Sequence, residues 1–425
     1  MTDVAARPLS ISDPEFWWRP LAARMADFAE MRADGPFTRA EITHPLTGEQ
    51  EAFYAVTRFD EVVEISRRPQ VFCSGRGSTS ILDMPAEALE FFGSFITMDD
   101  PRHARQRGIV AREFTPRRLQ TLIDSVEGIC SELIDGICEQ GEVDLVEAIS
   151  APFPLLVICD MMGIPRSEFR TVLDATNVIL GAGDPEMTGS DDLLGALFGA
   201  GITLTNLTNE LAEERRRNPT DDLTSALVHS SSGDQELLAP AELGPFFILL
   251  AVAGNDTTRT ATSLAMDFLG KHPDQRRTWQ EDLDGITPTA VEEIVRYASP
   301  VVFMRRTATE AVTLSGHDFD EGDKFVLFYG AANRDPLVFD DPERFDVRRD
   351  PNPHVGFGGP GPHFCLGAHL ARRELAIVFR QLLTRLPDIE PAGEPEYLEA
   401  AGIPLVGGIK RLPVRFTPTA PAAAR

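Results

Sequence analysis

Two long stretches of the chain place apolar residues at helical spacing. In the first, they recur every three or four positions, at Leu193, Leu194, Leu197, Phe198 and Ile202. The pattern continues through Leu207 and Leu211 into a charged run that stops at Pro219. This spacing is typical of an amphipathic helix, so we expect one long helix over this stretch.

The second stretch, from Pro240 to Gly270, is apolar on almost every face and is followed by Lys271-His272-Pro273. About 30 residues at a rise of 1.5 Å each would make a helix roughly 45 Å long. A helix that is apolar all round must run through the middle of a molecule, because no face of it suits water.

Alternation typical of strands is confined to four short pieces, at Ala52–Thr57, Val312–Leu314, Phe325–Phe328 and Leu412–Phe416. The pattern therefore predicts a mainly α fold with a small β-rich lobe. No shift in composition divides the chain, so we expect a single domain over residues 1–425. A short flexible N-terminus and a Pro/Ala-rich tail after Phe416 would flank it.

The amino-acid composition of the chain and its net charge argue against some classes of binding partner. The 425 residues are 43% hydrophobic and 25% charged, which is ordinary for a globular protein, and the formal net charge is −26. So acidic a surface repels phosphate groups, which argues against nucleic acid and against anionic lipid as partners.

The chain also predicts a cytoplasmic protein with no transmembrane segment. The N-terminus lacks a signal peptide, and the longest apolar run, Phe246 to Ala253, is far shorter than the roughly 20 residues that cross a bilayer. The cysteines form no CxxC pair and no even-numbered framework, which fits a reducing compartment. They are Cys73, Cys130, Cys138, Cys159 and Cys365.

A glycine-rich loop from His354 to Gly367 precedes a helical pattern over Ala368–Leu386. Its formal G-x-G-x-x-G has no preceding strand and no βαβ context, so a dinucleotide site is not expected. A zinc site at His363 and Cys365 lacks further ligands.

The loop suits a single thiolate presented to a flat, bulky ligand. Glycines let the backbone approach such a ligand, and the start of the following helix should lower the pKa of Cys365. Haem iron held by a cysteine thiolate fits this arrangement. A buried structural cysteine in a glycine-rich turn is the alternative that the segment by itself leaves open.

Two further segments carry polar residues in unusual places. Asp256 and Thr257 follow Gly254 in the middle of the long apolar helix, where a hydroxyl can bond a carbonyl one turn back and bend the helix. Beside an iron site they could bind dioxygen and relay protons. The alternative is a cluster of polar side chains packed against a neighbouring loop. In a helix expected from Pro288 to Ala298, Glu293 and Arg296 share one face and can pair.

These motifs occur in an order that resembles soluble bacterial cytochromes P-450. The resemblance covers about residues 40 to 416 and includes Asp100–Arg107, Ala253–Thr258, Glu293–Arg296, Ala332–Asp335, Pro342–Phe345 and the Cys365 loop. One departure concerns loop length, because the family's usual Phe seven residues before the cysteine is replaced by Gly358, with Phe357 one position earlier.

The resemblance implies the P-450 fold, with the long central helix over a haem b. Cys365 would be the axial thiolate and metal ligand, and Asp256 and Thr257 the catalytic acid–alcohol pair. The haem propionates would be bound by four cationic donors, His103, Arg107, Arg306 and His363. Glu293, Arg296 and Arg344 would form a structural triad.

The resemblance further implies a monooxygenase that inserts one atom of O₂ into a hydrophobic small molecule. We expect its pocket to be lined by five apolar segments: Phe91–Met98, Val178–Leu180, Leu249–Ala253, Val301–Met304 and Ile403–Val406. Asn255, Arg259 and the segment from Gly408 to Pro413 are similar to actinobacterial hydroxylases of sterols and of methyl-branched or isoprenoid lipids. Hydroxylation of a terpenoid or other secondary metabolite is the alternative, and a peroxygenase or a haem-binding sensor or carrier would fit less well.

No flavin or iron–sulfur motif is evident, so NAD(P)H-derived electrons must arrive through an external ferredoxin and ferredoxin reductase. A basic cluster on this acidic chain could dock the ferredoxin. It comprises Arg102, Arg105, Arg107, Arg112, Arg117 and Arg118. An ordinary solvated arginine face is the alternative interpretation of this cluster.

Overall fold

The computed structural model describes residues 10–44, 48–115, 118, 120, 122–181, 184–189, 192–229, 237–399 and 402–422. The first nine residues, expected to be flexible, and Arg117 lie outside these ranges. Residues 417–422 of the Pro/Ala-rich tail are described, and the Thr417 hydroxyl donates to Asp388 at 2.5 Å.

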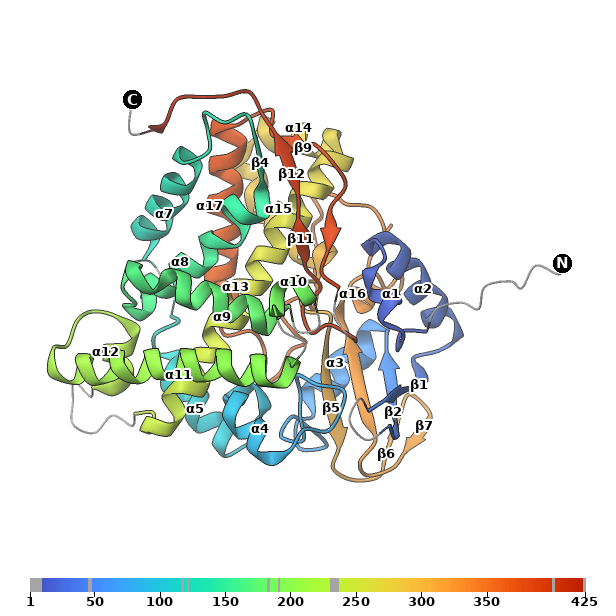
Figure 1. Ribbon diagram of the computed structural model, residues 1–425. Coiled ribbons are helices and arrows are strands. Elements are labelled where there is room, and N and C mark those ends of the chain that lie inside the picture. The colour runs from blue at the N-terminus through green and yellow to red at the C-terminus, as the bar shows by residue number, and fades with distance from the viewer. Residues whose placement is uncertain are drawn as a thin grey trace.

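Helices make up most of the molecule and fill the left and centre of Figure 1. They are α1 (Pro14–Trp18), α2 (Leu21–Asp34), α3 (Phe59–Arg67), α4 (Ala86–Phe92), α5 (Arg102–Ala111), α7 (Ile123–Asp135), α8 (Pro152–Met162), α9 (Phe169–Leu180), α10 (Pro185–Thr188), α11 (Leu193–Arg217), α12 (Leu223–Val228), α13 (Pro240–Lys271), α14 (Pro273–Glu281), α15 (Leu283–Ala298), α16 (Tyr329–Ala332) and α17 (Ala368–Arg385). Short 3₁₀ or π turns are η1 (Phe95–Thr97), η2 (Val146–Ser150) and η3 (Arg166–Glu168).

The strands form a main sheet in the order β1-β2-β8-β5-β3 and three smaller sheets, β4-β12-β9, β10-β11 and β6-β7. Their bounds are β1 (Phe37–Thr43), β2 (Gln50–Val56), β3 (Phe72–Cys73), β4 (Glu142–Asp144), β5 (Phe303–Ala308), β6 (Val312–Leu314), β7 (His317–Phe319), β8 (Lys324–Phe328), β9 (Glu390–Pro391), β10 (Glu396–Tyr397), β11 (Ile409–Arg411) and β12 (Pro413–Arg415). The main sheet lies at the right of Figure 1, so the predicted β-rich lobe is confirmed.

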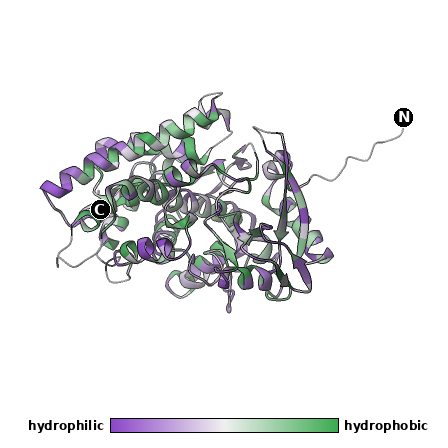
Figure 2. Cartoon of the chain, turned by 90° about the horizontal axis from the view of Figure 1, so that it is seen from below, coloured by the Kyte–Doolittle hydropathy of each residue, from purple (hydrophilic) through white to green (hydrophobic). Residues whose placement is uncertain are grey.

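The two long helices begin and end close to their predicted positions. Helix α13 starts at Pro240, where a missing N–H costs nothing, and the Glu242 side chain accepts from the Ala239 N–H at 2.7 Å. It ends before Pro273, which cannot continue a helix. Helix α11 is apolar over its first half and hydrophilic at its C-terminal end, as Figure 2 shows.

Helix α13 runs through the largest hydrophobic core, where it contacts α8, α9, α11, α15 and α17. Most residues of its second half are buried. The predicted central position of this helix is therefore confirmed. No helix in the described part of the chain is long and apolar enough to span a membrane.

The predicted start of the helix carrying Glu293 is wrong. Helix α15 begins at Leu283 and includes Pro288, because the Asp282 side chain caps the earlier turn by accepting from the Gly285 N–H at 2.9 Å. Pro288 lies in the second turn of this helix.

Candidate active site

A cavity of about 210 Å³, counted as the space open to the centres of water molecules, lies between α13 and the loop that carries Cys365. Thr257 and Ala253 line it from α13, and Cys365, Phe357 and Gly358 line it from the loop. The two motifs that the sequence singled out, more than 100 residues apart, therefore face the same space.

The glycines of this loop serve different purposes. Gly358 has φ +86°, a backbone conformation that favours glycine. Gly359 and Gly361 pack against Ser66 of α3, where an added Cβ would come within 2.5 Å of Oγ and 2.2 Å of the carbonyl oxygen. Close packing on a neighbouring helix, as well as access to a ligand, therefore requires glycines here.

Cys365 is held by its backbone and lies three residues before the start of α17. Its N–H donates to the carbonyl oxygen of Phe357 at 2.9 Å. Burial raises the pKa of its thiol, while the Gly367 N–H and the positive charges of Arg107 and Arg372 lower it. The net direction is upward, so the expectation of a lowered pKa is wrong for the chain by itself; a metal ion deprotonates a coordinating thiol outright.

Three cationic or imidazole side chains line the cavity near Cys365. They are Arg107, Arg306 and His363, and the His103 ring lies behind His363 with centroids 4.2 Å apart. Arg107 donates to the Phe364 carbonyl at 2.5 Å and Arg306 to the Arg305 carbonyl at 2.7 Å. Among the described residues, no carboxylate forms an ion pair with Arg107, Arg306 or His363.

This cluster lacks the negative charge that such groups normally attract. Burial, followed by the charges of Arg306, His103 and Arg107, lowers the pKa of His363 to about 2. The His103 Nδ1 lies 3.5 Å from Asp100, and its buried Nε2 has no partner within the described part of the chain. The donor set fits a ligand that brings carboxylates, as haem does with its propionates.

On the opposite wall, the hydroxyl of Thr257 donates to the Ala253 carbonyl at 2.7 Å, one turn back in α13. The expected bond is therefore present. Asp256 is fully buried and does not line the cavity. One of its oxygens accepts a long hydrogen bond, 3.3 Å, from the Asn255 amide, and the other has no partner among the described residues.

Burial raises the pKa of Asp256 to about 8, opposed by the charge of Arg259. Arg259 in turn donates to the Asn177 side chain of α9 at 2.9 Å. Asp256 can therefore exchange a proton near neutral pH, although its carboxyl lies behind the cavity wall.

A second buried acid was missed from the sequence. Glu374 of α17 is fully buried, and burial raises its pKa to about 8. It accepts a hydrogen bond of 3.0 Å from Thr258, which lines the cavity next to Thr257. Helical spacing from Leu370 and Val378 places Glu374 on the buried face of its helix, so the signal for it was present.

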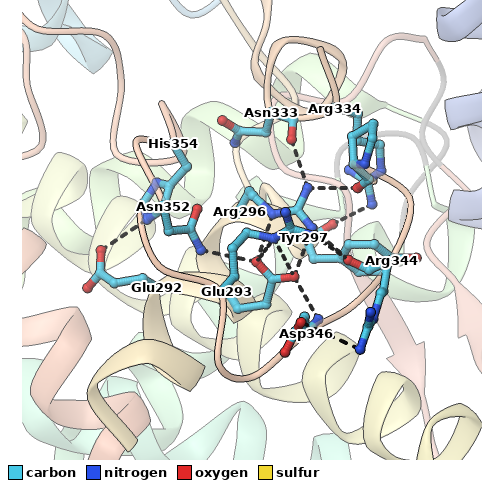
Figure 3. A network of polar contacts seen from close by, with 12 residues as sticks. Glu292, Glu293, Arg296, Tyr297, Asn333, Arg334, Arg344, Asp346, Asn352 and His354 are labelled. Atoms are coloured by element: carbon cyan, nitrogen blue, oxygen red, sulfur yellow. Dashed lines mark hydrogen bonds and ion pairs between the residues drawn. The ribbon is translucent and has the colours of Figure 1, made fainter. Parts of the chain in front are cut away.

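Glu293 and Arg296 form a fully buried ion pair at 2.7 Å, drawn at the centre of Figure 3. The predicted triad partner is wrong. Arg344 contributes only its carbonyl oxygen, 3.1 Å from Arg296 Nη2, while its exposed side chain reaches Asp346 at 3.7 Å. Arg349 supplies the second guanidinium, 3.2 Å from Glu293.

The expected lining of the pocket is confirmed in part. Phe95, Leu249, Leu250, Val301 and Met304 line the cavity. No residue of Val178–Leu180 or Ile403–Val406, both within the described ranges, does so. These two segments pack instead against the neighbouring hydrophobic clusters, and Val406 pairs with Val301 through an isolated bridge behind the wall.

Comparisons with known proteins place these features in a family. Residues 196–396 match the cytochrome P450 family model. A methyl-branched lipid omega-hydroxylase of Mycobacterium tuberculosis is 42% identical over 98% of this chain and 96% of its own length. A steroid C26-monooxygenase of Mycolicibacterium smegmatis is 35% identical over 92% and 90%.

Among solved structures, a Mycobacterium marinum cytochrome P450 in complex with pseudoionone superposes with a TM-score of 0.88. Its identity is 39%, over 97% of this chain and all of the other. Sequence and fold thus agree over nearly the full length, and the chain belongs to the cytochrome P450 family as a monooxygenase, a membership that implies a haem held by a thiolate.

Proposed function

We propose that this monooxygenase hydroxylates the chain end of a methyl-branched, isoprenoid or sterol-type lipid. The observation that carries the proposal is the part of the cavity wall that is built from apolar side chains. These include Phe246, Leu249, Leu250, Val301 and Met304. Such a wall binds a hydrocarbon segment by excluding water and selects against charged groups near the reacting carbon. Relatives at 35–42% identity bear names that specify hydroxylation at a lipid or steroid chain end.

In this proposal the Cys365 thiolate would hold the iron of haem b, and His103, Arg107, Arg306 and His363 would bind its propionates. Within the described residues, Arg107, Arg306 and His363 have no ion pair with a carboxylate and the buried His103 Nε2 has no partner, and both observations support the assignment. Bound haem supplies the activation of dioxygen; the overall reaction turns a C–H bond, O₂, two electrons and two protons into C–OH and water.

In this proposal, Thr257 and Asp256 deliver the two protons that the reaction consumes. The Thr257 hydroxyl, anchored on the Ala253 carbonyl, lies on the cavity wall and can hold a water molecule there. Asp256, with a pKa raised to about 8, can recharge that water with a proton after a side-chain movement.

Electrons come from NAD(P)H through a ferredoxin and its reductase in the cytoplasm. Three of the five described arginines of the predicted basic cluster form ion pairs: Arg102 lies 3.9 Å from Glu90, Arg105 lies 2.8 Å from Glu242, and Arg118 lies 3.0 Å from Glu113. Arg112 has no ion pair within the described residues, so it is the member best suited to meet an acidic ferredoxin.

The test is a binding and turnover screen with the haem-loaded enzyme. Methyl-branched fatty acids, cholest-4-en-3-one and pseudoionone are titrated while the haem Soret band is followed, and products are identified by mass spectrometry after turnover with NADPH, ferredoxin and reductase. We expect the branched lipid or the sterol to shift the band and to gain one oxygen at a terminal carbon.

The alternative substrate class is a terpenoid, favoured by the pseudoionone complex of the M. marinum relative. Product from pseudoionone only would support that alternative and contradict a methyl-branched fatty acid or a sterol as the substrate. Product formed from hydrogen peroxide without reductase, at the rate of the complete system, would instead identify a peroxygenase.

A further inference from the structure

The side chain of Glu292, next to the structural pair on α15, joins three separate elements. Arg372 of α17 donates to its two oxygens at 2.5 and 2.8 Å, which is a bidentate ion pair. His354, at the start of the glycine-rich loop, lies 3.0 Å from the same carboxylate, as Figure 3 shows. Although burial raises the pKa of Glu292, Arg372 and His354 hold it at about 2, so this carboxylate is charged.

The guanidinium of Arg372 lies over the ring of Phe357, 4.4 Å from its centroid. A cation this close to an aromatic face is attracted to it, and a second contact can fix the position of the cation. Glu292 provides that contact. Phe357 lines the cavity, and its carbonyl oxygen accepts the Cys365 N–H at 2.9 Å. A short path of direct contacts therefore leads from Glu292 to the backbone of Cys365.

Arg372 also acts on Cys365 through its charge. Arg372 and Arg107 are the two side chains whose positive charges act at Cys365. Neighbouring Arg373 is exposed, and no ion pair of it is found in the described part of the chain. Two adjacent arginines thus differ in their environment, which makes Arg373 a matched control.

We propose that the Glu292–Arg372 ion pair is a positioning element for the proximal thiolate, which clamps Phe357 and supplies a fixed positive charge beside Cys365. The proposal rests on the assignment of Cys365 as haem ligand made above. A positive charge near the iron favours the reduced state, because reduction adds a negative charge. A clamped ring keeps the loop, and with it the sulfur, in one place.

The experiment compares Arg372→Gln, Arg372→Lys and Arg373→Gln with the wild type, all loaded with haem. Spectroelectrochemistry gives the midpoint potential of the iron, and the reduced CO complex gives the fraction with the thiolate-type Soret band. We expect Arg372→Gln to shift the potential to a more negative value and to lose part of the thiolate-type band. Arg373→Gln should change neither.

Arg372→Lys separates the two effects, because lysine keeps the charge but cannot make the bidentate contact. We expect it to restore the potential towards wild type while the loss of the thiolate-type band persists. If Arg372→Gln yields no folded protein, the Arg372→Lys spectrum decides: an undiminished thiolate-type band overturns the proposal.

A lower melting temperature of Arg372→Gln with unchanged potential and spectrum would also overturn the proposal, because the pair would then only stabilise the fold. Failure of the proposed function has a different signature. A wild-type CO complex without the thiolate-type band would refute the assignment of Cys365 before any variant is compared.

Discussion

Glu293 of α15 and Asp256, in the middle of α13, are both fully buried carboxylates, yet their surroundings differ completely. The oxygens of Glu293 accept from Arg296 at 2.7 and 2.8 Å, from the backbone N–H of Asp346 at 2.9 Å, and from Asn352 at 3.0 Å. Arg349 approaches to 3.2 Å as well. Asp256 accepts one long hydrogen bond, and its other oxygen has no partner in the described part of the chain.

The difference explains what each region does. A carboxylate with this many donors fixes the positions of the elements around it. Glu293 and Arg296 therefore hold the chain between α16 and the Cys365 loop in place. A buried carboxyl with few hydrogen-bond donors keeps its proton to a higher pH. Asp256 is therefore better suited to proton transfer than to fixing the positions of neighbouring elements. Neither carboxyl lines the cavity, although the helices that carry them, α15 and α13, both contribute residues to its wall.

The largest effect is expected on stability at Glu293, whose many hydrogen-bond donors make this region rigid. Glu293→Gln leaves Arg296 as a buried charge without its partner, which typically costs about 3–5 kcal/mol of stability. Thermal or urea unfolding should therefore show a large loss of stability, with loss of bound haem.

The two nearby arginines are the controls for this prediction. Arg349→Gln should destabilise the fold by an intermediate amount, because its side chain contacts Glu293. Arg344→Gln should change stability by less than about 0.5 kcal/mol, since its side chain is exposed. Equal losses for both variants would contradict the assignment of Arg349 to the triad.

The second effect concerns proton delivery on the distal side. Thr257→Ala should still bind substrate and accept electrons, but product per NAD(P)H should fall several-fold while hydrogen peroxide rises. Asp256→Asn should slow turnover by on the order of 10²-fold and increase the solvent isotope effect, a magnitude common for general acid–base groups.

Thr262→Ala is the matched control for Thr257→Ala, because Thr262 lies on the same helix, is buried and does not line the cavity. It should keep the coupling of the wild type. If Thr257→Ala keeps the wild-type yield of product per NAD(P)H, the Thr257 hydroxyl has only a structural role, as the donor to the Ala253 carbonyl.

A third effect is the pH dependence of stability. The pKa of Asp256 is raised from 3.8 to about 8 in the fold, so the folded chain binds this proton more tightly than the unfolded chain. Stability from this group must therefore fall as the pH rises from about 4 to about 8, with a slope of at most about 1.4 kcal/mol per pH unit.

Asp256→Asn should remove that part of the slope, which urea unfolding at several pH values can measure. Its advantage over the wild type should grow with pH across this window and then level off. A constant difference between the two proteins from pH 4 to 8 would show that the fold does not raise the pKa of Asp256.

The smallest effect is expected at the molecular surface. Arg112→Glu should slow the first electron transfer from an acidic ferredoxin a few-fold at low salt, and the difference should disappear at high salt because exposed charges are screened. Arg118→Glu offers a comparison, since Arg118 is already paired with Glu113. Unchanged reduction kinetics of Arg112→Glu at low salt would exclude this residue from the docking surface.

The sequence by itself determined the parts of this protein that depend on local periodicity. Helices α11, α13 and α17 follow apolar spacing, and they begin where that spacing predicted, because a helix forms its hydrogen bonds within its own segment. The order of the motifs likewise identified the family, and the i, i+3 spacing paired Glu293 with Arg296. That the chain is one domain stays a prediction.

Only the tertiary structure decided which distant residues meet. Strand β5 was missed, since part of its pairing comes from β3, more than 200 residues earlier along the chain. Strand β1 was missed as well, although its partner β2 follows it directly. The orientation of loops and helices in space decides that Arg349, and not Arg344, contacts Glu293. It also decides that Thr257, and not Asp256, lines the cavity. Helical spacing determines neighbours along one element, but contacts between elements arise only when the packed core brings their side chains together.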